Sequence, residues 1–147
     1  MLQQLFAGGV VSLINIAVHA VTTTILIFSL RRFSRRIEET RMRLHLTLAM
    51  MMAAGVLMLA HCAEIGIWAA FYSWADVTPP GGESLYFAFV NYTTLGYGDL
   101  IPVARWHLIG PMTAMNGILL FGLSTALLFA ALQKAMIQLR IMAPDAP

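Results

Sequence analysis

The stretch "NYTTLGYGDL", Asn91–Leu100, places two glycines around a tyrosine, followed by a carboxylate, between long apolar segments. Glycine has no Cβ and adopts positive φ readily, so Gly96 and Gly98 permit backbone conformations that other residues rarely adopt. Successive carbonyl oxygens can then turn to one side of the chain instead of alternating. The stretch therefore predicts a short column of backbone oxygens, whose use depends on where the chain holds it.

The composition indicates a membrane protein. Apolar residues make up 59% of the 147 positions and charged residues only 11%, which is too apolar for a soluble domain of this size. A helix needs roughly 20 mostly apolar residues to cross a bilayer, and three segments qualify: residues 5–30, 44–74 and 108–137. The first has no Lys or Arg before it and no small-residue cleavage site, so we expect a retained helix and not a secretory signal.

The basic residues predict the orientation. Six of the nine fall in residues 31–43, between the first two spans, and short basic loops stay on the cytoplasmic side. The N-terminus and the stretch Asn91–Leu100 should then lie outside, and the C-terminus inside. This clustering has a membrane explanation, so the net charge of +2 does not indicate a nucleic-acid partner. Contact with anionic lipid is a secondary expectation for Arg31, Arg32, Arg35 and Arg36.

A short helix should precede the glycines. The loop at residues 79–82, "PPGG", interrupts helix, and Glu83 or Ser84 can cap a new helix over residues 85–93. About nine residues cannot cross a bilayer, so we expect a re-entrant element that enters the protein and stops. Its C-terminal end carries a partial negative charge, which stabilises a cation. Four such chains around an axis would enclose a dehydrated monovalent cation, so the site requires a symmetric oligomer.

The sequence "TTLGYGD" resembles the potassium-channel signature, and the order of span, loop, short helix, glycine-rich stretch and span is similar to the pore domain of potassium channels. The resemblance covers residues 44–137. It implies an all-α membrane protein with three transmembrane helices, a re-entrant pore helix and a filter loop, assembled as a tetramer in a bacterial-type inner membrane. Residues 1–30 would be an accessory helix, 31–43 a basic cytoplasmic linker and 138–147 a short cytoplasmic tail.

The resemblance also implies the roles of the filter residues. Potassium would be the permeant ligand, and no cofactor is expected. Asp99 would lie at the external mouth, where a ring of carboxylates concentrates cations. Gly98 would let the chain leave the filter. The ion-binding residues implied are Thr94, Leu95, Gly96, Tyr97 and Gly98, with potassium on the carbonyl oxygens of the first four.

Three positions depart from the family pattern. Related channels often have a tryptophan pair where this chain has Tyr86 and Phe87, which removes an indole hydrogen bond to Asp99. The Tyr86 hydroxyl can replace it. Val90 occupies the position of a buried glutamate in some bacterial relatives. These departures bear on slow inactivation of the filter and not on its selectivity.

The last span carries the candidates for gating. Gly117 stands nineteen residues after Gly98, close to the gating hinge of related channels, and both a hinge and close helix packing are open there. Packing is expected at Gly122. Asn116 could face an aqueous cavity or bond to a neighbouring helix, and we favour packing. Thr125 aligns with a cavity position of the family.

His61 and Glu64 are three residues apart in the second span, hence on one face, and ionisable groups in a span are functional candidates. We expect Glu64 to bond to the short helix near Asn91 or to the segment after the filter, a structural role that we favour over proton sensing. A metal site that combines both with Cys62 is not expected, because adjacent helical positions diverge.

The first span is the least explained segment. Asn15 and His19 within it could pack on the pore domain or bind a partner, and packing is favoured. The predicted function is passive, potassium-selective flux, and no nucleophile–base pair or metal triad suggests an enzyme. The alternative is a non-conducting, channel-like subunit or sensor that modulates a partner, although the filter motif is intact.

Overall fold

The computed structural model describes residues 1–34 and 42–138, and every regular element within them is helical. The predicted all-α class is therefore confirmed. The elements are α1 (Leu2–Ser34), α2 (Met42–Trp74), α3 (Ser84–Tyr92), the 3₁₀ helix η2 (Ala104–Trp106) and α4 (Ile109–Gln138).

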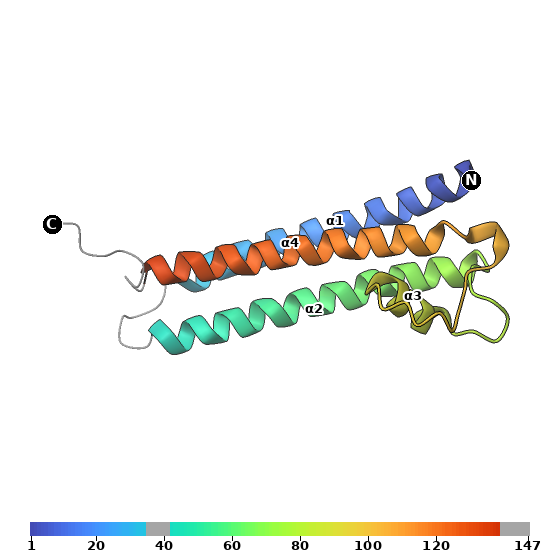
Figure 1. Ribbon diagram of the computed structural model, residues 1–147. Helices are drawn as coiled ribbons and strands as arrows, with labels where there is room; N and C mark the ends of the chain where they lie inside the picture. Colours follow the sequence, from blue (N-terminus) through green and yellow to red (C-terminus); the bar gives the residue numbers. More distant parts are fainter. Residues whose placement is uncertain (35–41, 139–147) are drawn as a thin grey trace.

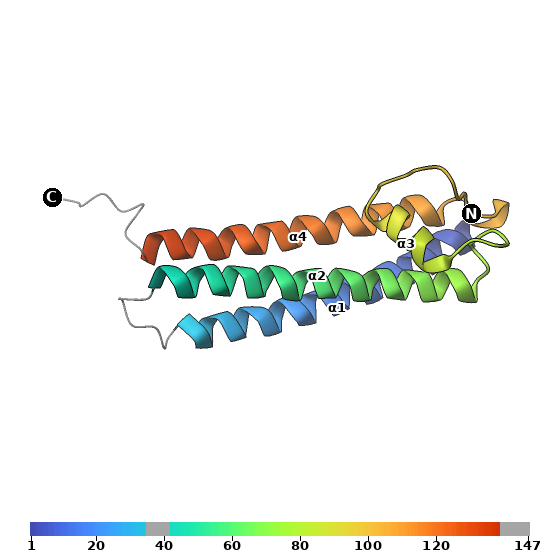
Figure 2. The same ribbon diagram turned by 90° about the horizontal axis from the view of Figure 1, so that it is seen from below.

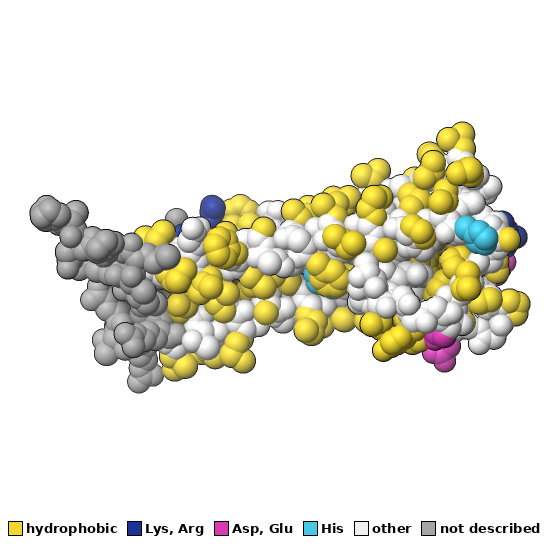
Figure 3. All heavy atoms as spheres, in the orientation of Figure 1, with side chains coloured by type: hydrophobic (Ala, Val, Ile, Leu, Met, Phe, Trp, Pro, Cys, Tyr) yellow, Lys and Arg dark blue, Asp and Glu magenta, His cyan; other side chains and the backbone are white. Residues whose placement is uncertain are grey.

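The three long helices form an elongated bundle (Figure 1). Each contains a stretch long and apolar enough to cross a membrane, with mean hydropathy of 1.9 to 2.0. Hydrophobic side chains are spread along the whole visible face, and the basic and acidic side chains lie near its two ends (Figure 3). This confirms the three predicted spans and a membrane protein. The boundaries differ slightly, because α1 continues through Arg31 and Arg32 and α2 begins at Met42.

The last turn of α1, the start of α2 and the end of α4 lie together, whereas the N-terminus and α3 lie at the opposite end (Figures 1 and 2). The linker arginines Arg35 and Arg36 and the tail beyond residue 138 lie outside the described residues. This arrangement agrees with the predicted topology, and the side that faces the cytoplasm stays a prediction.

Helix α3 packs against α2 and α4 through an aromatic core. The Tyr72 ring of α2 packs against the Phe87 ring of α3, with 5.3 Å between the ring centroids. Their cluster also includes Trp68, Tyr92 and Ile109, and all five side chains are almost fully buried. Aromatic side chains contribute large apolar areas to a core. The core therefore fixes the short helix and the position of the chain that leaves it.

The predicted side-chain cap of α3 is wrong. Glu83 occupies the N-cap position but its side chain makes no capping hydrogen bond, and the Ser84 hydroxyl instead lies 3.0 Å from Oγ1 of Thr78. Backbone and indole bonds hold the loop around it: the Val103 N–H donates to the Val77 carbonyl, and Nε1 of Trp106 donates to the Ala75 carbonyl at 2.9 Å. The loops before α3 and before α4 thus support each other.

Candidate functional site

The backbone that follows α3 alternates in the sign of φ from residue to residue. The N–H groups of Thr94 and Leu95 donate to carbonyls of the last turn of α3, and then φ is positive at Thr94 (59°), Gly96 (58°) and Gly98 (77°) but not at the residues between them. Two of these positions are glycines, for which positive φ costs little. Thr94 is not, and such uncommon backbone angles cluster at functional sites.

The same stretch lies open on the surface of the chain. Residues 93–99 are all exposed, and the side chains of Leu95 and Tyr97 are 53% and 69% exposed although the helix before them is packed in the core. The predicted site residues from Thr94 to Asp99 therefore follow a helix that is packed in the core, but their own chain does not cover them.

Asp99 is tied back to α3. The Tyr86 hydroxyl donates to its Oδ2 at 2.6 Å, and the Leu100 N–H donates to its Oδ1 at 3.1 Å. The prediction that Tyr86 replaces the missing indole partner is confirmed. The hydrogen bond to the carboxylate, with some desolvation and the charge of Asp99, raises the pKa of Tyr86 above the ordinary value of tyrosine. Phe87 and Val90 are buried and take no part in this contact.

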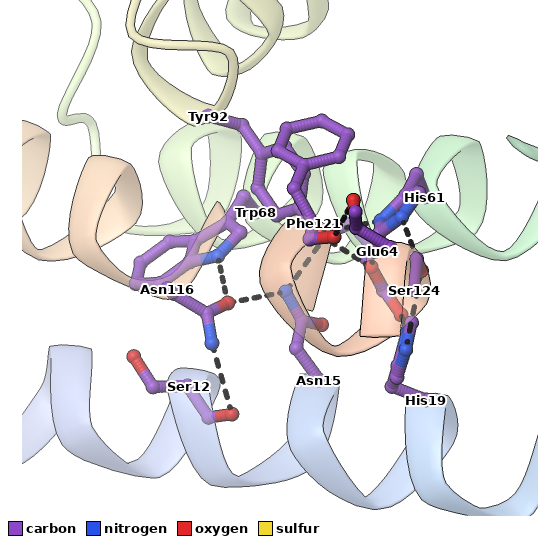
Figure 4. A network of polar contacts seen from close by, with 11 residues as sticks. Ser12, Asn15, His19, His61, Glu64, Trp68, Tyr92, Asn116, Phe121 and Ser124 are labelled. Atoms are coloured by element: carbon purple, nitrogen blue, oxygen red, sulfur yellow. Dashed lines mark hydrogen bonds and ion pairs between the residues drawn. The ribbon is translucent and has the colours of Figure 1, made fainter. Parts of the chain in front are cut away.

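Glu64 lies at the centre of a buried polar cluster behind the site (Figure 4). The Tyr92 hydroxyl donates to its Oε2 at 2.5 Å, and Nδ1 of His61 lies 2.9 Å from the same oxygen. Nδ1 of His19, from α1, lies 2.9 Å from Oε1. The expected bond from Glu64 to the short helix is confirmed, and its partner there is Tyr92, one residue beyond Asn91. The Asn91 amide instead donates to the Tyr72 hydroxyl.

The contact of His19 with Glu64 was not predicted from the sequence. The available signal was its ionisable ring inside an apolar span, which marks a functional or paired residue. Its distance in sequence from Glu64 gave no indication of contact. Cys62 is exposed, in agreement with its predicted exclusion from a site with His61 and Glu64.

Residues 46–134 match the model of a family described as "Ion channel". The match covers more than half of the chain and includes α3, the alternating stretch and most of α2 and α4. The chain belongs to this ion-channel family. No curated protein and no solved structure matches the channel. The whole of α1 precedes the matched region, so the hydrogen-bond partners that α1 provides lie outside the match.

A second buried cluster joins α1 to helices α2 and α4 of the channel. Oδ1 of Asn116 accepts from Nε1 of Trp68 at 3.0 Å and from Nδ2 of Asn15 at 3.1 Å. Nδ2 of Asn15 also lies 3.2 Å from the Glu64 carbonyl, and Nδ2 of Asn116 reaches the Ser12 carbonyl (Figure 4). The predicted packing role of Asn116 and the packing of Asn15 on the pore domain are confirmed.

Gly117 of the channel allows α4 to approach α3 closely. A Cβ there would overlap the carbonyl oxygen of Tyr92, which supports packing, and its role as a hinge stays a prediction. At Gly122 no atom lies within 4 Å of such a Cβ, so the packing expected there is not made within the described chain. Thr125 is exposed and its hydroxyl donates to the Phe121 carbonyl; its place in a cavity stays a prediction.

Proposed function

We propose that this ion channel is a homotetramer that conducts potassium selectively and passively, with potassium bound by backbone carbonyls of Thr94, Leu95, Gly96 and Tyr97. The observation that carries the proposal is the alternation of φ in sign from Thr94 to Gly98. In an extended strand, carbonyls alternate between two sides. When φ alternates in sign, successive N–H groups can gather on one side, and the carbonyls then gather on the other.

The exposure of this stretch supports assembly around an axis. One chain offers oxygens to only one side of an ion, whereas a dehydrated cation needs them all around. Leu95 and Tyr97 leave much of their apolar surface uncovered, and neighbouring copies in a ring would cover it. A closed ring of identical subunits satisfies both needs.

Two electrostatic features support a cation as the permeant species. Helix α3 ends at Tyr92, just before the alternating stretch, and the C-terminal end of a helix carries a partial negative charge. Asp99 is exposed beyond the other end of the stretch, where four carboxylates would concentrate cations. Selectivity would follow because the carbonyl cage compensates the dehydration of potassium better than that of sodium.

The orientation and lipid contacts belong to the same proposal. The filter would face the outside of a bacterial-type inner membrane and the linker the cytoplasm. Arg31 and Arg32 are exposed in the last turn of α1, where they would contact anionic lipid headgroups.

The test is ion flux into liposomes that contain the purified protein. We expect flux with potassium and little with sodium; equal permeability would remove the selectivity claim. Gly96→Ala should abolish flux, because φ at this position is 58° and alanine is strained there. The matched control is Gly55→Ala in α2, where a Cβ meets nothing within 4 Å; it should conduct like the wild type. Crosslinking in mild detergent should give a tetramer, whereas a monomer would argue against the pore.

A further inference from the structure

A ring of hydrogen-bond partners closes around Glu64 and draws one group from α1, one from α3 and one from α4 (Figure 4). Nδ1 atoms of His19 and His61 lie 2.9 Å from its two carboxylate oxygens. The Nε2 atoms of both imidazoles lie near one hydroxyl, that of Ser124, at 3.4 and 2.9 Å respectively. The Tyr92 hydroxyl completes the ring. All of these side chains are buried.

The donors and acceptors of this ring can be counted. An ionised carboxylate only accepts hydrogen bonds, so Nδ1 of each histidine must carry a proton. A neutral imidazole protonated on Nδ1 leaves Nε2 as an acceptor. The Ser124 hydroxyl has one proton and can donate to one Nε2 only. The other Nε2 must therefore donate to the Ser124 oxygen, which requires one additional proton on the two imidazoles.

Charge balance leads to the same count. Glu64 is fully buried, and a buried ionised carboxylate is costly unless a positive charge compensates it. Among the described residues, no Lys or Arg side chain forms an ion pair with Glu64; the basic side chains within 4.0 Å of its carboxylate are His19 and His61. One imidazolium makes the cluster neutral overall, whereas two neutral rings leave a net negative charge inside an apolar bundle.

The distances favour a proton over a metal ion. His19, His61 and Glu64 offer ligand atoms within 4.8 Å of one another. Ligands bound tetrahedrally to zinc at about 2.0 Å lie about 3.3 Å apart. The two nitrogen–oxygen separations of 2.9 Å are instead those of N–H···O hydrogen bonds.

We infer that His19 and His61 bind one proton between them through Ser124, and that this proton fastens α1 and the end of α3 to Glu64. The groups that face the bound proton are Glu64 on α2, Tyr92 on α3 and Ser124 on α4. Tyr92 lies two residues before Thr94. On the proposed function, loss of this proton at alkaline pH loosens the support of the filter and lowers potassium flux.

The proton itself is tested without any measurement of conduction. Nitrogen-15 NMR of histidine-labelled protein in liposomes at neutral pH should show three protonated nitrogens among the four of His19 and His61, with signals assigned by His19→Gln and His61→Gln. Ser124→Ala should confine the proton to one ring, which separates an imidazolium from a neutral ring. Glu64→Gln should lose the proton. Ser29→Ala, which removes an exposed hydroxyl of α1, should change nothing.

Several results would overturn the inference. Two neutral rings or two cationic rings in the wild type would contradict the shared proton, and signals that change on addition of a chelator would indicate a metal instead. If Glu64→Gln does not fold, the Ser124→Ala spectrum alone decides, because both rings keep their carboxylate partner in that variant.

The link to conduction is tested by potassium flux as a function of pH. Wild-type flux should fall as pH rises above neutral, and His19→Gln should abolish that dependence. Flux that is potassium-selective but independent of pH would remove the link while leaving the proposed function intact. An absence of flux at every pH would contradict the proposed function, and the NMR count would still decide whether the proton is bound.

Discussion

Gly117 of α4 faces the backbone carbonyl of Tyr92 so closely that a Cβ on the glycine would overlap the carbonyl oxygen and lie 3.2 Å from Cδ1 of the tyrosine ring. The contact joins the middle of α4 to the last residue of α3. Because Tyr92 lies two residues before Thr94, where the alternating stretch begins, the position of that stretch depends on this close approach of two backbones.

Gly117→Ala should destabilise the protein by about 1 to 3 kcal/mol, the usual cost of overpacking. The obstacle is backbone, which cannot move aside as a flexible side chain can. Gly122→Ala is the matched control, since no atom lies within 4 Å there and alanine favours helix by about 1 kcal/mol over glycine. Thermal unfolding in detergent measures both. If Gly117→Ala leaves stability unchanged but alters flux, a hinge explains the glycine better than packing.

Asp99→Ala should make Tyr86 ionise at lower pH than in the wild type. The hydrogen bond to Asp99 and its charge raise the pKa of the tyrosine, so the neutral phenol is the stabilised form. The bond should persist at pH values below about 10, the ordinary pKa of tyrosine, and be lost only as pH rises through the higher folded value. Ultraviolet absorbance titration measures phenolate formation. Tyr86→Phe should remove the component of the titration curve that Asp99→Ala shifts; a curve unchanged by Asp99→Ala would show that the bond does not form.

Asn116→Ala should destabilise the protein by about 1 to 2 kcal/mol. The substitution leaves Nε1 of Trp68 without its acceptor inside the bundle, and buried unsatisfied groups cost about 1 to 3 kcal/mol, with smaller values typical between membrane helices. Met115→Ala is the control, because that neighbouring side chain is 63% exposed. Unfolding in detergent compares the two. Equal losses would mean that the Asn116 bonds contribute nothing beyond side-chain volume.

Much of the fold follows from the sequence because its causes are local. Runs of apolar residues specify the spans, and the loop at residues 79–82 specifies the break before α3. Gly96 and Gly98 indicate backbone angles with positive φ, and both residues adopt them in the structure. The proposed filter could be located for the same reason, since its proposed ligands are backbone carbonyls of consecutive residues.

The cluster around Glu64 could not be assembled in the same way. His19 and Ser124 are far from Glu64 in sequence, and each is unremarkable within its own helix. Their contact depends on how α1 and α4 rotate and cross, which apolar periodicity does not specify when all faces of a helix are hydrophobic. The ionisable residues could be marked as candidates, whereas their pairing required the packed structure.

Removal of residues 1–34 should destabilise the rest of the chain, even though the region matched to the ion-channel family lies beyond them. Helix α1 provides His19 to Glu64, Asn15 to Asn116 and the Gln4 side chain to the Leu108 N–H. Without it, Glu64 would keep His61 and Tyr92 but lose His19, and Asn116 would lose Asn15. A buried polar group left without its partner costs about 1 to 3 kcal/mol. We expect the shortened protein to give less folded material and a lower midpoint of unfolding in detergent. Glu64→Leu together with Asn116→Leu should restore part of that loss in the shortened protein and should destabilise the full chain. A shortened protein as stable as the full one would show that α1 is a separable accessory.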